Sequence, residues 1–267
     1  MLDAAVISLE AIQNMNQPAY VQSAIKQNGE KASWRIAALR DAALGVGARA
    51  GLLYQTRLNN QALEKVARRL DTVYAFGALM IQGRVVPPVF TETKDNYTQG
   101  NNVTLRLGRQ SYKVEFQARF SSRPPHWRDY LISPVGSTLA MSSDELLPRD
   151  SGEQEVWRKA AAEGWTQGVE QAGVIFETSM NRLNRDFVGM CRYHILALKN
   201  MVTMPIVAEQ NMPINASGDS MNLDETLLRI TALPEFNTDM KEWRSLTSRH
   251  QRAPGDVEPS GVIEKEK

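Results

Sequence analysis

The sequence predicts an α+β fold with an N-terminal helical region, a small antiparallel sheet and one long amphipathic helix. Apolar residues from Ser151 to about Val202 recur at three- and four-residue steps, which places them on one helix face. Two shorter helical patterns precede this stretch, and residues 226–233 alternate in the manner of a strand. Helices and strands in separate runs of this kind are typical of the α+β class.

Composition limits the classes of function. The chain has 267 residues, of which 42% are hydrophobic and 23% charged, which are ordinary values for a globular domain. The net charge of +1 gives no electrostatic basis for binding nucleic acid or an anionic membrane, so no direct nucleic-acid contact is expected. No apolar run approaches the roughly 18 residues of a transmembrane helix.

The chain is predicted to contain one domain between two less ordered ends. Residues 1–32 are expected to form a partly mobile lead with a short helix. Residues 33–246 are expected to form a single α+β domain. From residue 247 to 267 the residues are polar, charged or turn-forming, and a disordered tail is predicted.

The first helical pattern begins near Ser33 and contains a glycine-rich run. No Gly-Lys-Ser/Thr follows the run, and its spacing does not fit the dinucleotide fingerprint, so a phosphate loop is the weaker interpretation. Ala43, Gly47 and Gly51 are four residues apart and therefore align on one helix face. We predict that they form a groove where another helix approaches closely. Leucine at Gly47 should overpack this groove, whereas alanine should be tolerated far better.

A second helical pattern covers residues 60–80, either continuous with the first or joined to it by a hairpin. Gly83 ends this pattern. The following segment, Val85–Phe90, contains two prolines and is expected at a sheet edge or on the surface, because proline cannot donate to a strand ladder.

The remaining segments predict loops and short strands. Residues 91–101 have the composition of a polar loop, and residues 103–116 predict a β-hairpin with its turn at Gly108–Gln110. Residues 205–215 look extended, and Gly218–Asp219 marks a turn before the strand at 226–233.

The long helix is expected to begin with Ser151 as its cap and to stop before Pro205. About 50 residues would make a rod of roughly 75 Å, which is too long for the core of one compact domain. Part of it could project, kink at Gly164 or Gly168, or pack on other chains. We expect neighbouring subunits to bury part of it, including Trp157 and Trp165 near its start.

The sequence offers little catalytic or metal-binding chemistry. Cys191 and His194 are one helical turn apart, but a closed zinc site needs further ligands. A packed thiol beside a partly buried imidazole is the better interpretation. No catalytic, metal or cofactor site is predicted, and the chain is not expected to be an enzyme.

An aromatic and charged cluster follows two prolines at Trp127, Arg128 and Tyr130. These residue types are favoured in protein interfaces, so the cluster is a candidate partner-binding patch together with Trp157 and Trp165. The alternative is that the cluster is a buried core aromatic covered by an ion pair. We prefer this structural interpretation.

Five segments, in order along residues 33–235, carry a family resemblance: Arg35–Gly47, Ala67–Asp71, Val85–Val89, Pro125–Leu131 and Leu228–Pro234. Together they resemble the DotC family, components of type IVB secretion and conjugation machines. The resemblance implies a non-enzymatic lipoprotein on the periplasmic face of the outer membrane. It also implies partners: DotD-like and DotH-like proteins, and copies of the chain in a ring, which together build an outer-membrane core complex.

Members of that family are anchored through a lipidated cysteine just after a signal peptide, and residues 1–32 contain no cysteine. Either the leader has been trimmed from this chain or this member lacks the anchor. The alternative hypothesis is a soluble cytoplasmic helical adaptor, for which sequence upstream of Met1 would be the discriminating observation.

Overall fold

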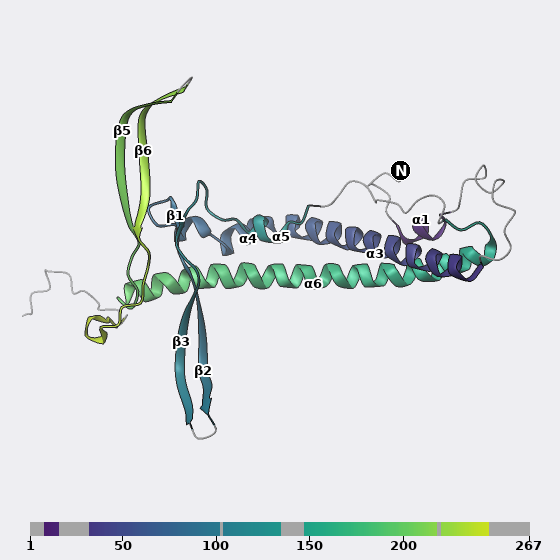
Figure 1. Cartoon of the computed structure of the whole chain (residues 1–267), viewed down its shortest axis with the longest axis horizontal. Helices are drawn as coiled ribbons and strands as arrows, with labels where there is room; N and C mark the ends of the chain where they lie inside the picture. The colour runs from purple at the N-terminus through teal and green to yellow at the C-terminus, as the bar shows by residue number, and fades with distance from the viewer. Residues whose placement is uncertain (1–7, 16–31, 102–103, 135–146, 218–219, 246–267) are drawn as a thin grey trace, which may run out of the picture. The chain divides into compact units, whose positions relative to one another are not determined.

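A computed structural model describes residues 8–15, 32–101, 104–134, 147–217 and 220–245 (Figure 1). Its helices are α1 (Leu9–Gln13), α3 (Ala32–Lys65), α4 (Ala67–Val73), α5 (Trp127–Leu131) and α6 (Ser151–Leu198), with 3₁₀ turns η2 (Phe76–Leu79) and η4 (Met240–Glu242). Its strands are β1 (Val85–Val86), β2 (Val89–Asn101), β3 (Thr104–Phe116), β4 (Arg119–Phe120), β5 (Ile206–Ser217) and β6 (Ser220–Ala232). They pair as three antiparallel two-stranded sheets, β1–β4, β2–β3 and β5–β6. The predicted α+β class is confirmed.

The chain divides into two compact units, Met1–Arg192 and Tyr193–Lys267, and the boundary falls inside α6. The sequence predicts a single domain over residues 33–246 instead. The apolar pattern of α6 continues across the boundary, so periodicity gives no sign of the division. The predicted tail at 247–267 lies outside the described residues.

In the first unit, α3 lies beside α6 and runs in the same direction (Figure 1). Gly47 faces the backbone of Ala161, and one turn later Gly51 faces the backbone of Trp165. A Cβ atom on either glycine would overlap the carbonyl oxygen opposite it. The two backbones are therefore in direct contact, an approach that only glycine permits.

The contact is reciprocal, because α6 presents two glycines of its own. Gly164 lies against the backbone of Leu44 and Ala48, and Gly168 lies against Ala48 and Leu52. Close contacts of this kind allow weak Cα–H···O hydrogen bonds between helices. Ala43, the first residue of the predicted groove, is fully buried in the adjoining cluster.

The two helical patterns of the first eighty residues form no hairpin. α3 continues for 34 residues through Asn59–Asn60, and the break comes at Val66, between α3 and α4. Asn60 does not turn the chain because its side-chain amide donates to the carbonyl oxygen of Ser133 at 3.0 Å while its backbone stays helical.

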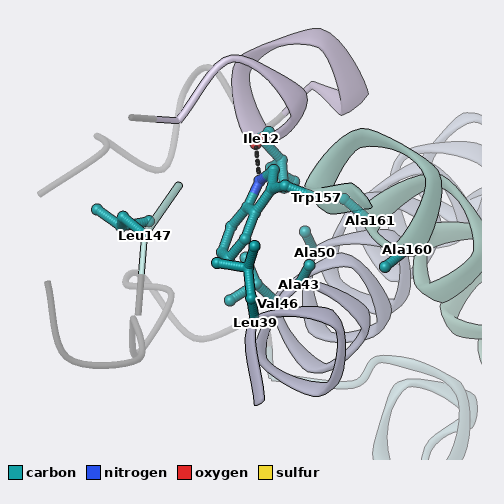
Figure 2. Close-up of a cluster of buried hydrophobic side chains, with 9 residues drawn as sticks. All are labelled: Ile12, Leu39, Ala43, Val46, Ala50, Leu147, Trp157, Ala160 and Ala161. Atoms are coloured by element: carbon teal, nitrogen blue, oxygen red, sulfur yellow. Dashed lines mark hydrogen bonds between the residues drawn. The ribbon is translucent and has the colours of Figure 1, made fainter. Parts of the chain in front are cut away.

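Trp157 is the centre of a buried cluster between the starts of α3 and α6 (Figure 2). Its indole N–H donates to the carbonyl oxygen of Ile12 in α1 at 2.8 Å, and its ring is fully buried. The expectation that only neighbouring subunits bury Trp157 is therefore wrong. The error came from treating the helix as an isolated rod, whereas α1 and α3 both cover its start. The nine buried members of the cluster are Ile12, Leu39, Ala43, Val46, Ala50, Leu147, Trp157, Ala160 and Ala161.

A buried ion pair holds the same ends of α3 and α6 together. The Arg35 guanidinium lies 2.8 Å from the Glu153 carboxylate, and both side chains are about nine-tenths buried, at 13% and 14% exposure. Arg35 also donates to the carbonyl oxygen of Leu147, and Glu153 accepts from the backbone N–H of Arg149. These extra hydrogen bonds compensate the two charges for the loss of water.

Both ends of α6 differ from the sequence prediction in their capping residues. Asp150, not Ser151, caps the start, since its carboxylate accepts from the backbone N–H of Glu153 at 2.8 Å. At the other end Asn200 has φ of 56°, and the N–H of Met201 reaches the carbonyl oxygen of Leu196. This is a Schellman cap, which stops the helix before Pro205 is reached.

The predicted hairpin at 103–116 is wrong in its turn position. β3 passes straight through Gly108–Gln110, with Gly108 opposite Asn96, and its partner β2 occupies the segment predicted as a polar loop. Polar side chains misled the prediction, since both faces of this ribbon carry them and composition alone resembled a loop.

Val85–Phe90 is buried, not on the surface. The prolines stand between β1 and β2, so neither has to donate to a ladder. Gly189 of α6 makes room for this segment, because a Cβ there would press on Val89 and the backbone of Phe90. Arg192 then donates to the carbonyl oxygen of Phe90 at 2.9 Å.

In the second unit, β5 and β6 confirm the strands predicted after the long helix. The strands pair in one continuous register from Val207 opposite Ile230 to Ser217 opposite Ser220. The predicted turn at Gly218–Asp219 lies outside the described residues.

The glycine contacts revise the expectation that alanine is tolerated at position 47. Gly47→Ala should lower the free energy of unfolding by about 1–3 kcal/mol, because the new methyl group must push two backbones apart. Gly45→Ala is the matched control: a Cβ there meets nothing within 4 Å, and stability should rise by about 0.5–1 kcal/mol. Urea denaturation of both variants checks the pair, and equal stabilities would contradict the interlocking of the helices.

Trp157→Ala should destabilise the first unit by about 3–5 kcal/mol, since it empties a fully buried site and removes a hydrogen bond. Trp157→Phe should cost less, because the phenyl ring still fills part of the site, although the bond to Ile12 is lost. Thermal melting of the purified variants measures both. A Trp157→Ala variant that melts like the wild type would show that the ring is not a core residue of this chain.

Candidate interaction site

The α5 cluster comprises the three candidate residues of α5 and the groups that they contact. Trp127 is fully buried, and its indole N–H donates to Asp71 at 2.6 Å. Arg128 lies over the Trp127 ring, 4.3 Å from its centroid, and pairs with Glu64 at 3.2 Å. Trp127 therefore cannot present its ring to a partner, and Arg128 covers the one side that points outward. The cluster has the geometry of a core aromatic with an ion pair above it.

Asp71 joins α4 to α5. Besides the indole N–H, its carboxylate faces His126 at 3.2 Å and Arg128 at 3.5 Å. The hydrogen bond from Trp127 is the main reason that the pKa of Asp71 is lowered, and the positive charge of Arg128 adds to it, against a smaller opposing effect of burial. His126 is committed to the backbone, because its Nδ1 caps α5 by accepting from the N–H of Arg128.

Tyr130 faces the opposite side of α5, toward α6. Its ring stacks on Phe76 with centroids 6.0 Å apart, and its hydroxyl donates to Asp186 at 3.1 Å. Asp186 is only 8% exposed and also accepts from Arg185 at 2.9 Å. Burial, reinforced by the Asp186 charge, raises the pKa of Tyr130 to about 12. The hydroxyl therefore stays protonated and works as a fixed donor.

A groove of about 770 Å³ opens beside Tyr130 in the first unit. Its apolar lining comes from the buried β1–β2 segment and α6, and its polar lining from residues 117–125, α5 and Arg182. Arg123 at the rim pairs with Asp129 at 2.7 Å. Sequence reasoning missed this groove, because its lining comes from three separate segments of the chain with no shared motif.

Trp165, the remaining aromatic candidate, is half-buried within the chain. Its ring lies 5.1 Å from that of Tyr54 in α3, and its backbone is the surface that Gly51 touches. Most of what Trp165 contacts is therefore α3, although part of its ring reaches the surface.

The second unit is the shorter of the two, yet it carries nearly as many exposed large apolar side chains as the first. Leu223 and Leu227 of β6 are 64% and 49% exposed and lie on the same face of the β5–β6 ribbon. Others in this unit are Ile195, Leu198, Met204, Ile206, Leu233, Phe236, Met240 and Trp243. Such a concentration of exposed apolar surface usually marks an interaction site. None of these residues is among the partner-binding candidates predicted from the sequence.

Cys191 is half-buried, and burial raises the pKa of its thiol, which leaves it a weak nucleophile. Within the described ranges, no group of three or more His, Cys, Asp or Glu side chains is placed to hold a metal ion.

Asp71 yields a prediction with a defined pH dependence. A lowered pKa means that its carboxylate stabilises the fold above the ordinary pKa of 3.8, and that this stabilisation is lost as pH falls through the lower folded value. Asp71→Asn should therefore lower the melting temperature at pH 7, while the gap from wild type shrinks below about pH 3.8. Melting curves of both proteins, recorded from about pH 2.5 to about pH 7, test this pH dependence. A gap that is independent of pH would assign the effect to packing alone.

Comparison with known proteins identifies the family of the chain. None of the helices in the described part of the chain is long and apolar enough to cross a membrane. A comparison with curated proteins finds no significant match. Residues 33–245, which include α3, the α5 cluster, α6 and the β5–β6 ribbon, match the family described as type IV secretory system, conjugal DNA-protein transfer. The chain therefore belongs to this family, T4SS_TraI.

Proposed function

We propose that the chain is a non-enzymatic structural subunit of the outer-membrane core complex of a type IVB secretion or conjugative DNA-transfer system. Membership of a conjugal transfer family supports the type of machine. The finer assignment rests on the resemblance of five segments to the DotC family, all of them within the matched residues 33–245.

The observation that carries the proposal is the β5–β6 ribbon. Its strands have 12 and 13 residues, and within the described chain no third strand pairs with either edge. An isolated two-stranded ribbon is at best marginally stable in water, and three strands or a covering layer are usually needed. Leu223 and Leu227 leave two large apolar side chains exposed on one face of the ribbon. A ribbon of this kind is suited to a subunit that is completed by its neighbours.

The proposed neighbours are DotD-like and DotH-like proteins and further copies of this chain in a ring. The proposed location is the periplasmic face of the outer membrane, with attachment through a lipid anchor. A soluble cytoplasmic helical adaptor is the second candidate, and it also requires a partner for the ribbon. Envelope fractionation separates the two, since only the first accompanies the outer membrane.

Replacing Leu223 and Leu227 by threonine should weaken assembly and leave the fold intact. Threonine keeps the β preference of leucine but removes most of the apolar surface. Exposed positions usually change stability by less than about 0.5 kcal/mol. The double variant should lose co-migration with its partners when the solubilised envelope is separated by size, while its melting temperature stays near that of wild type.

The control variant carries Glu209→Thr and Asn211→Thr, which lie on the opposite face of the ribbon. Like the leucine variant, it introduces two threonines, and it should assemble normally. Normal co-migration of the leucine variant would refute the docking role of this face. A clear fall in its melting temperature would do so as well, because the leucines would then belong to the core of the chain.

A further inference from the structure

The groove of the first unit has an apolar floor between two separate cations. Val86, Val89 and Met190 form the floor, and all three are fully buried or nearly so. Arg119 of β4 and Arg182 of α6 also line the groove. A volume of about 770 Å³ lies within the range of about 300–1,000 Å³ that is typical of ligand-binding pockets.

The acidic residues of the groove are already neutralised. Asp129 is held by two hydrogen bonds from Arg123, at 2.7 and 2.9 Å. Asp186 accepts from Arg185 and from the Tyr130 hydroxyl. Neither carboxylate is therefore free to balance a further cation.

Arg119 and Arg182 have no such partner. Among the residues that the structure describes, no carboxylate lies within 4 Å of either guanidinium. Both are exposed, and both act on the Tyr130 hydroxyl, where their charges oppose the rise in its pKa. Both arginines line the groove together with Tyr130, and the Arg182 guanidinium lies 5.3 Å from the centroid of the Tyr130 ring.

Rigid elements hold these two cations in place. Arg119 belongs to β4 and is paired with Val86 of β1, while Arg182 lies in the middle of α6 and stacks over the Tyr130 ring at 5.3 Å. A binding group on a strand or helix is better positioned than one on a loop. Guanidinium groups also match carboxylates geometrically, since they can donate two parallel hydrogen bonds.

We propose that this groove binds an extended acidic segment of a partner protein, whose carboxylates pair with Arg119 and Arg182. Apolar side chains of the segment lie on the floor between them. Charge complementarity selects the acidic partner, and the apolar floor favours a peptide over a simple anion. The inference takes from the proposed function only that the occupant is a protein; it does not depend on the outer membrane or on the β5–β6 ribbon.

The test uses the purified full chain and a random octapeptide library. Peptides selected by binding should be enriched in Asp or Glu next to an apolar residue. A fluorescent copy of the selected peptide should bind at least tenfold more weakly to the Arg119→Gln/Arg182→Gln variant. Replacing its acidic residues by Asn or Gln should weaken binding to wild type by a similar factor.

Arg68→Gln/Arg69→Gln is the matched control, because it removes the same charge from exposed positions of α4 outside the groove. Its affinity should stay within twofold of wild type, and both double variants should melt like wild type. Failure to select any peptide, selection without acidic enrichment, or equal binding to the groove variant would overturn the proposal. A single-stranded oligothymidine that binds wild type and not the groove variant would also overturn it, in favour of nucleic acid.

These outcomes are independent of the assembly test on the ribbon. Loss of peptide binding with normal co-migration in the envelope would still support the groove. Loss of co-migration in the leucine variant would leave the peptide measurement unchanged. Each proposal can therefore fail alone.

Discussion

Direct contact between the backbones of α3 and α6 is the constraint on which the first unit depends. Gly47 and Gly51 on one helix, and Gly164 and Gly168 on the other, remove the side chains that would keep the axes apart. At this separation little room remains between the helices for large residues, so Trp157 packs where the contact ends, beneath α1. Trp165, within the contact, places its ring beside Tyr54 of α3. A single added methyl group at one of the glycines acts on backbone that cannot yield cheaply.

The same constraint explains where the second cluster of the first unit lies. Beyond Gly168 the helices carry larger residues, and Leu63 and Leu183 are buried in a cluster with Trp127 and Phe76. α5 and the proline segment provide the additional layer that two diverging helices need. Gly189 allows a similar close contact there, since its missing side chain lets the backbone of Phe90 lie against α6. Tyr130 and Asp186, anchored in this cluster, border the groove that the two unpaired arginines flank.

The sequence predicted the helices and the strands of the second unit well, because periodicity and glycine spacing are local signals. Gly47 and Gly51 could be identified as packing residues from their four-residue spacing, but their partners Gly164 and Gly168 could not be paired with them across the chain. The role of Trp157 depended on α1, which the sequence shows only as a short apolar patch. β2 was missed because an exposed ribbon needs no alternation of polar and apolar residues. The groove was invisible for a different reason: Arg119 and Arg182 meet only through the fold.

The division of the chain inside α6 bears on how such a subunit is stabilised. The first unit contains two buried clusters, a buried ion pair and interlocked helices, and has the contacts of a self-sufficient fold. The described part of the second unit contains the end of α6, the β5–β6 ribbon and η4; it buries Tyr193, Leu196 and Val202 but leaves Leu223 and Leu227 of the ribbon exposed. A partner that binds only the ordered ribbon shifts the folding equilibrium of the second unit toward the ordered state. Under the proposed function, assembly therefore adds stability to the second unit by covering the exposed leucines, whereas the two clusters of the first unit are buried by the chain itself.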